Sequence, residues 1–594
     1  MTFTTRPTLR GTFGMVASTH WLASQSAMGV LERGGNAFDA AVCAGFVLHV
    51  VEPHLNGPGG EVPAIVATAD DHIPKVLCGQ GPAPAGATIA HFHDLGLDLV
   101  PGSGPLAATI PGAVDAWLLL LRDHGTWRLR DVLSAAIGYA RAGHPLAAGV
   151  VATIGRVRDL FAEHWPTSAA LWLRDGKPPA AHAMFANPAY ATTLERLVTE
   201  AEAAGSGRES QIEAARHTWR EGFVAEAIDA FSRQAFRDSS GREHSGLLTG
   251  HDLATWTATW ELAATTEWND LTVAKTPAWG QGPVLLQALG ILDTLGVPGE
   301  FDLGTERGIH FVTEVVKLAM ADREAWYGDV LDSALPALLT KKYAAQRASL
   351  VGALASGELR PGAPQGRTPR LPQAYAARRT SWDLSETTGE PTVSPSGRTR
   401  GDTCHVSVVD SWGNMIAATP SGGWLQSSPT APDLGFCLGS RAQMFWLEEG
   451  LPSSLVPGRR PRTTLSPTLV LRAGRPVLAC GSPGGDQQDQ WQLLFLLRHL
   501  GGGMSVQEAI DAPAWHTASF PGSFFPRTMQ PRSLIVEDRL GEPVIAGLER
   551  RGHVVTRSGP WSLGRLCAVT RDPDTGVVAA GANPRGMQNY AVGR

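Results

Sequence analysis

One threonine, Thr403, stands where a long polar segment gives way to the apolar run CHVSVVD. Its hydroxyl could attack the carbonyl carbon of the preceding residue, Asp402, and hydrolysis of the resulting ester would cut the chain. Thr403 would then be a new N-terminus. Its α-amine, with an unperturbed pKa of about 8, could take the proton of its own hydroxyl. An ordinary strand threonine after a surface loop has the same pattern, so this segment alone leaves both interpretations open.

A glycine-rich loop, residues 481–485 (GSPGG), stands between a predicted strand and a helix predicted to open at Asp486. The successive backbone N–H groups of Gly484 and Gly485 could form an oxyanion hole, aided by the helix N-terminus. A turn that needs glycine for its geometry is the alternative. Such a loop could also hold a phosphate, but the chain has no GxxxxGK[ST] motif, so a P-loop is excluded.

Few other residues stand in patterns that suggest chemistry. The segment His91-Phe92-His93-Asp94 resembles the HxH pair of metal-dependent amidohydrolases, but no further His or Asp stands at a telling spacing, and a surface pair is favoured. Neither HExxH nor GxSxG occurs. Cys404 could be a nucleophile, but in an alternating strand it faces away from Thr403, so a packing role is favoured. We therefore expect a site that needs no metal and no organic cofactor.

Three helices are predicted in the part of the chain that precedes Thr403. The stretch 17–33 is typical of a helix closed by Gly34-Gly35. Asn36 can cap a second helix, which is apolar on nearly every face and should be buried. Residues 308–328 carry apolar side chains at helical spacing.

Strands are predicted around the two candidate sites. From about residue 355 to 402 the chain is polar and rich in Pro, Gly, Ser and Thr, which is typical of a long mobile linker. Directly after Thr403, the alternation of CHVSVVD, the turn SWGN and the run MIAAT predict a hairpin. A second pair of strands, around Ala473-Gly474, leads into the glycine loop.

The composition is that of an ordinary globular protein of 594 residues, with 43% hydrophobic and 18% charged residues and a net charge of −6. No basic stripe occurs, so nucleic acid is not an expected partner. No secretory leader and no run of about 18 apolar residues is seen, so no membrane partner is expected. The six cysteines are scattered without a CxxC pair. A reduced, cytoplasmic protein is the simplest expectation.

Blocks along almost the whole chain resemble the γ-glutamyltranspeptidase family of N-terminal nucleophile (Ntn) hydrolases. The matching blocks are GGNAFDAAV (34–42), VVEPHLNGPGG (50–60), IPGAVDAW (110–117), HFVTEVVKLAMADREAWYGD (310–329), DTCHVSVVDSWGN (402–414), PGRRPRTTLSPTLVL (457–471), GSPGGD (481–486) and ANPRGM (582–587). The resemblance implies an α+β fold, the αββα four-layer sandwich, made as one precursor. It also implies a cut into a large chain, 1–402, and a small catalytic chain, 403–594, that stay together in one fold.

The resemblance also assigns catalytic roles by position. Thr403 matches the family's catalytic threonine, and the implied cleavage is between Asp402 and Thr403. Ser421, in TPSGG, falls where a second threonine supports the nucleophile. Gly484 and Gly485 match the oxyanion pair.

Three further residues match positions that line the family's substrate pocket. Thr463 and Thr464 fall where two serines face the substrate carboxylate, and Gln443 matches a pocket glutamine. Arg462, an extra cation beside Thr463, could bind a small acid.

Three departures from the family pattern affect the substrate. Gln80, in GQGPAPA, stands where an arginine grips the α-carboxylate of γ-glutamyl groups. Trp446 stands where an aspartate holds the α-amine, and Gly423 replaces an asparagine. Because a bidentate arginine contact contributes about 2–3 kcal/mol, these losses should largely abolish glutamyl recognition.

The sequence therefore predicts an autoprocessed N-terminal threonine hydrolase that cleaves an acyl, amide-type bond of a small acid. The GQG variant resembles oxamate-type amidohydrolases and homologues from pathways to 4-alkyl-proline units. A C–C hydrolase that removes an oxalyl-type group is accordingly a second hypothesis. An ordinary glutathione hydrolase or γ-glutamyl transferase is a third, and an inactive homologue that only binds is a fourth.

Overall fold

The computed structural model describes residues 3–71, 73–296, 302–373, 403–585 and 589–594, and two seven-stranded antiparallel sheets form its centre. The first sheet has the order β1 (Leu9–Gly11), β22 (Val578–Ala582), β21 (Cys567–Arg571), β17 (Arg475–Gly481), β16 (Thr468–Arg472), β11 (Leu271–Lys275) and β10 (Ala264–Trp268). The second has the order β23 (Tyr590–Gly593), β2 (Met15–Ser18), β12 (Val406–Val409), β13 (Met415–Ala418), β3 (Val62–Ala67), β4 (Lys75–Gly79) and β9 (Thr259–Leu262).

The two sheets pack face to face, with β12 and β13 lying against β17. An apolar core that includes Met415, Leu469 and Val569 fills the space between them. The other face of β12 is covered by helix α2 (Ala37–Val51). All four residues of β12 are consequently buried, because both faces of this sheet are covered.

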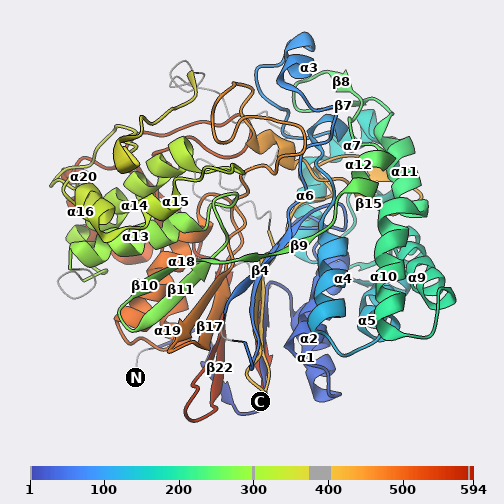
Figure 1. Ribbon diagram of the computed structural model, residues 1–594, viewed down its shortest axis with the longest axis horizontal. Helices are drawn as coiled ribbons and strands as arrows, with labels where there is room; N and C mark the ends of the chain where they lie inside the picture. The colour runs from blue at the N-terminus through green and yellow to red at the C-terminus, as the bar shows by residue number, and fades with distance from the viewer. Residues whose placement is uncertain (1–2, 72, 297–301, 374–402, 586–588) are drawn as a thin grey trace.

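Helices cover the outer face of each sheet (Figure 1). The helices on the side of the second sheet include α1 (Trp21–Glu32), α2, α4 (Ala113–His124) and α5 (Leu129–Ala142), with α9 (Pro188–Ala203), α10 (Arg208–Glu221) and α11 (Phe223–Ser232) packed outside them. Those next to the first sheet include α13 (Pro283–Thr294), α14 (Glu306–Trp326), α16 (Lys341–Ala348), α18 (Gln488–Leu496), α19 (Val506–Asp511) and α20 (Glu542–Arg550). The layers run helix, sheet, sheet, helix, which is the predicted αββα order.

Element boundaries follow local chemistry and differ from the prediction where tertiary contacts intervene. Asn36 caps α2, and its side chain accepts from the backbone N–H of Asp39 at 3.0 Å. The first helix begins at Trp21 rather than residue 17, because residues 15–18 form β2. Helix α18 begins at Gln488 rather than Asp486, and the carboxylate of Asp486 instead accepts from Ser523 at 2.6 Å.

The predicted linker, about 355–402, is only partly described. Residues 355–373 are held by hydrogen bonds such as Gly362 N to Asp322 Oδ1 at 2.7 Å and Trp326 Nε1 to Gly362 O at 3.0 Å. This part therefore contacts α14, and the mobility of the linker stays a prediction. The predicted cleavage residue Asp402 lies outside the described residues.

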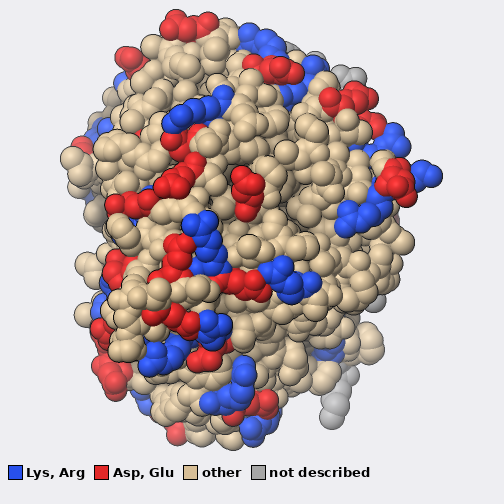
Figure 2. Space-filling view, turned by 90° about the vertical axis from the view of Figure 1, so that its right-hand side faces the viewer, with Lys and Arg blue, Asp and Glu red and all other residues tan. Residues whose placement is uncertain are grey.

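The surface carries charges of both signs. On the helical face drawn in Figure 2, basic and acidic side chains lie interspersed. Pairs between neighbouring helices, such as Arg141 with Glu195 at 2.5 Å, balance part of this charge. Within the described parts of the chain, no helix combines the length and the apolar character that crossing a membrane requires.

Candidate active site

The hairpin of β12 and β13 places Thr403 against Ser421. The antiparallel register that pairs Val406 with Ala418 continues past the strand ends and sets Thr403 opposite Ser421. Their hydroxyl oxygens lie 3.2 Å apart, and both residues are 1% exposed. The two sequence-predicted residues are therefore brought together at the start of β12.

An arginine and a glutamate, which the sequence analysis missed, stand behind Ser421. Arg441 Nη2 donates to Ser421 Oγ at 3.0 Å, and Arg441 Nε donates to Glu61 Oε1 at 2.6 Å. Glu61 is also fixed by its backbone, which exchanges hydrogen bonds with that of Ser421 at 2.8 and 3.0 Å. A buried, charge-balanced pair thus positions the hydroxyl beside Thr403. The sequence gives no signal for this pair, because Glu61 and Arg441 lie far apart along the chain and each is an ordinary polar residue in its own segment.

The glycine loop lies at the end of the sandwich where β12 begins. Strand β17 ends at Gly481, where a Cβ atom would lie 2.3 Å from His405 Nδ1, so the loop packs two residues from Thr403. Gly484 has φ +104°, a conformation that favours glycine. Gln488 donates to the carbonyl of Gly484. No described residue accepts from the N–H of Gly484 or Gly485, so both remain available to a developing negative charge.

The predicted pocket residues Gln443, Gln80 and Gly423 are buried and partly committed to the protein itself. Gln443 donates to the Ser440 carbonyl at 3.0 Å and accepts from the Phe525 backbone at 3.0 Å, so it holds loops together. Gln80 Nε2 donates to Gly81 O at 3.1 Å, whereas its Oε1 is buried without a hydrogen-bond partner among the described residues.

Gly423 and the two predicted threonines differ in what they offer a ligand. Gly423 has φ +64°, and a Cβ atom there would lie 2.8 Å from the backbone nitrogen of Gly60, so a side chain does not fit. The hydroxyl of Thr463 accepts from the Leu465 N–H at 3.3 Å. The hydroxyl of Thr464 is buried and has no hydrogen-bond partner among the described residues.

Arg462 and Trp446 meet at a buried carboxylate. Arg462 Nη2 donates to Glu324 Oε2 at 3.0 Å, and Trp446 Nε1 donates to Glu324 Oε1 at 2.6 Å. Burial alone would raise the pKa of Glu324, but Arg462, Arg527 and Arg323 lower it to about 2. The Trp446 side chain is buried. It also carries the Arg527 guanidinium over its ring, 3.6 Å from the centroid.

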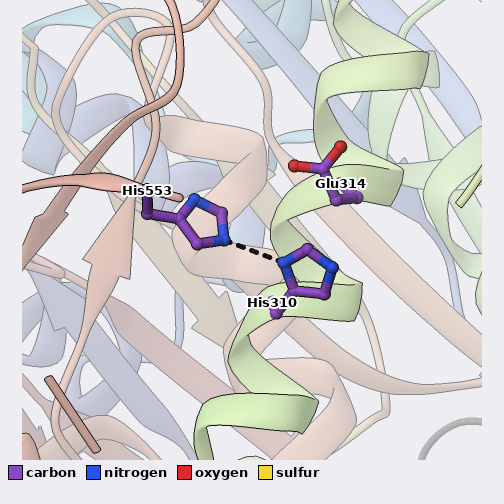
Figure 3. Close-up of side chains that lie close together, drawn as sticks. All are labelled: His310, Glu314 and His553. Atoms are coloured by element: carbon purple, nitrogen blue, oxygen red, sulfur yellow. Dashed lines mark hydrogen bonds between the residues drawn. The ribbon is translucent and has the colours of Figure 1, made fainter. Parts of the chain in front are cut away.

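The described residues hold one cluster with metal-ligand types, which the sequence analysis did not predict (Figure 3). His310 and Glu314 on α14 face His553, with His310 Nδ1 and His553 Nε2 2.9 Å apart. Glu314, however, is already neutralised by Lys317 at 2.5 Å and Arg360 at 3.3 Å. The predicted HxH pair on α3 (Ile89–Asp94) has an exposed His93 and joins no such cluster in the described chain.

The family model described as Gamma-glutamyltranspeptidase matches residues 23–593. The chain belongs to the gamma-glutamyltranspeptidase family. The oxamate amidohydrolase proenzyme of Klebsiella pneumoniae is 30% identical over 592 residues, 97% of each chain. The glutathione hydrolase-like YwrD proenzyme of Bacillus subtilis is 29% identical over 590 residues, 98% of this chain and 99% of the relative. A solved structure of LmbA2991 with a threonine-to-alanine substitution is 58% identical, covers 100% of both chains and has a TM-score of 0.95.

These findings confirm the predicted family and the predicted Ntn-hydrolase fold class. They also confirm the predicted resemblance to oxamate-type amidohydrolases and 4-alkyl-proline pathway homologues within the family. The family member described here is accordingly a hydrolase or transferase. Several of its relatives are named as proenzymes, that is, as precursors of a processed enzyme.

Proposed function

We propose that this family member cuts itself between Asp402 and Thr403 and then acts as an N-terminal threonine hydrolase. The cut would give chains 1–402 and 403–594, which stay together as a heterodimer. The observation that carries the proposal is the hydroxyl of Thr403 beside Ser421 and Arg441, at the end of the sandwich that also holds the glycine loop.

In the proposed mechanism the α-amine of the processed Thr403 takes the proton of its own hydroxyl. The oxygen attacks the acyl carbon, and the electron pair of the carbonyl moves onto its oxygen. The N–H groups of Gly484 and Gly485 stabilise this oxyanion. Collapse expels the leaving group, which takes the proton from the amine, and water then hydrolyses the ester and restores the threonine.

The substrate we propose is a small acid whose carboxylate lies close to the attacked carbonyl, rather than a γ-glutamyl compound. The glutamyl contacts are replaced by Gln80, by Gly423, which has no room for a side chain, and by Trp446. An amide bond of an oxamate-like compound is the first candidate. Removal of an oxalyl-type group by C–C hydrolysis is the second, supported by the 58% identity to LmbA2991 over both whole chains. The two differ in the product, an amine or a new C–H bond.

A denaturing gel and N-terminal sequencing test the processing. We expect two bands, with the smaller chain beginning Thr-Cys-His-Val, and a single inactive chain for Thr403→Ala. Wild-type protein that stays uncut yet turns over substrate would refute the mechanism. An uncut, inactive wild type would instead support a homologue that only binds.

A further inference from the structure

Five charged side chains form a buried cluster next to the glycine loop, and their charges do not balance. Arg323 and Glu324 lie on α14, and Asp486 directly follows Gly485. Arg462 and Arg527 complete the cluster, and no member has a side chain more than 7% exposed. Three guanidinium groups therefore face two carboxylates.

Arg527 is the cation of this cluster that has no close carboxylate partner in it. Arg323 pairs with Asp486, and Arg462 pairs with Glu324. Arg527 has only a long contact, 3.9 Å from its Nη2 to Glu324 Oε1. The nearby Arg460 does pair with two carboxylates, but those side chains are about a quarter exposed, so water screens them.

One nitrogen of the Arg527 guanidinium has no hydrogen-bond partner in the described chain, whereas its Nε donates to the carbonyl of Gly522 at 3.3 Å. Its Nη1 donates to the carbonyls of Met444 and Phe445 at 3.1 and 2.9 Å, and Trp446 covers its face. Its Nη2 is buried and unpartnered among the described residues. A buried donor that makes no hydrogen bond costs about 1–3 kcal/mol of stability, and a charged donor costs more. A residue held in that state is therefore a candidate to bind an anionic ligand.

The electrostatics of the cluster favour one more negative charge. Burial lowers the pKa of Arg527 to about 9, although Glu324 opposes this. Burial likewise lowers the pKa of Arg462. A carboxylate bound between them would stabilise both cations.

The cluster is connected along the chain to residues of the candidate active site. Asp486 ties it to the glycine loop, and the unpartnered hydroxyl of Thr464 lies two residues from Arg462. Gln443 links its own loop to residue 525, two residues before Arg527. A position where relatives of γ-glutamyl specificity place an ammonium-binding aspartate is occupied here by Trp446, which supports a cation. An aromatic ring stacked on a guanidinium thus stands where the resemblance implies an anion.

We propose that Arg527, assisted by Arg462, binds the carboxylate of the acyl group that Thr403 attacks, and that Trp446 positions Arg527 for this contact. The inference rests on the proposed function and narrows its substrate class. The ligand is an acid of the oxalyl type, in which the carboxylate accepts from Arg527 Nη2 while the neighbouring carbonyl points to the glycine loop.

Calorimetric titration of the processed enzyme with oxamate and with its neutral counterpart oxamide tests the proposal. We expect the wild type to bind oxamate at least tenfold more tightly than oxamide, and Arg527→Gln to lose that difference. Arg498→Gln is a matched control, because Arg498 is also buried near a tryptophan ring (5.3 Å) but belongs to a separate cluster with Glu537 and Arg585. It should bind oxamate like the wild type.

Equal oxamate affinity in the wild type and Arg527→Gln would overturn the proposal, as would a wild type that does not prefer oxamate. If Arg527→Gln does not fold, Arg527→Lys replaces it. That variant keeps the charge without the planar fork, and wild-type affinity in it would count equally against the assignment. Binding and product release are measured separately, so a protein that binds oxamate through Arg527 yet hydrolyses nothing would refute the proposed function alone.

Discussion

At the scale of single residues, the direction of the hydrogen bonds around Ser421 matters most. A guanidinium can only donate, so Arg441 occupies an acceptor position of Ser421 Oγ, which lies 3.2 Å from the hydroxyl oxygen of Thr403. In the proposed mechanism, a hydrogen bond from Ser421 would stabilise the negative charge that develops as the threonine oxygen loses its proton. Glu61 keeps Arg441 in place without adding net charge.

Removal of this hydroxyl should slow both self-cleavage and turnover. We expect Ser421→Ala to reduce each rate more than tenfold, which corresponds to the loss of one aligned polar partner. Ser421→Thr, which restores a hydroxyl, should keep most of the activity. A time course on a denaturing gel measures self-cleavage, and kcat measures turnover. Normal rates in Ser421→Ala would show that Ser421 is only a turn residue.

The altered pocket also predicts poor γ-glutamyl activity. Glutathione and γ-glutamyl anilides should be at least about a hundredfold worse in kcat/KM than the true substrate, or roughly 2.7 kcal/mol of lost transition-state binding. A side-by-side assay with oxamate-like acids, following the release of amine or oxalate, measures this. Rapid glutathione hydrolysis would contradict this prediction and would indicate an ordinary γ-glutamyl hydrolase or transferase.

At the scale of elements, the contact between α14 and the segment after α20 is sensitive to acid. Burial, followed by the charges of His310, Lys317 and Arg551, lowers the pKa of His553 from 6.5 to about 3, and burial lowers that of His310. At these two histidines the folded state therefore binds fewer protons than the unfolded chain does. The stabilisation is complete above about pH 6.5 and is lost as the pH falls toward 3, at most ~1.4 kcal/mol per pH unit for each histidine.

Replacing His553 by a residue that does not titrate should make the free energy of unfolding depend less on pH. We expect His553→Gln to lose less unfolding free energy than the wild type between pH 7 and pH 5, whatever its stability at pH 7. Denaturant unfolding at both pH values measures the two differences. His91→Gln is the control, because this half-buried residue lies on the separate helix α3. Equal losses in His553→Gln and the wild type would show that this histidine does not titrate in the window.

Local elements could be predicted from the sequence, whereas contacts between distant segments could not. The Asn36 cap, the hairpin after Thr403 and the strand pair before the glycine loop depend on neighbours within a few residues. Arg441 meets Glu61 across 380 positions of the chain. Arg527 likewise meets its cluster only through the folded arrangement of α14 and two loops. No periodicity or motif carries such information, so these residues were found only in the structure.

At the scale of the whole molecule, the two proposed chains are interleaved. In the second sheet β12 and β13 come after residue 402, yet they lie between β2 and β3, which come before it. In the first sheet β1 and β11 flank strands that come after residue 402. Each chain would therefore expose strand edges and apolar faces without the other.

This interleaving predicts that the cut protein behaves as one cooperative unit. Calorimetry of the processed enzyme should show a single unfolding transition, and chains 1–402 and 403–594 produced separately and mixed should regain little activity. Two resolved transitions, or chains that separate in native gel filtration, would contradict this expectation.

The register of β12 and β13 also sets an order of events. Thr403 reaches Ser421 only once the hairpin has paired, and Arg441 reaches Ser421 only once its loop has docked on Glu61. A broken peptide bond does not re-form in water, so under the proposed mechanism each nicked molecule is a permanent record that its chain once assembled correctly. The fraction of nicked chains in a cell extract would then count successful folding, even for molecules that unfold afterwards.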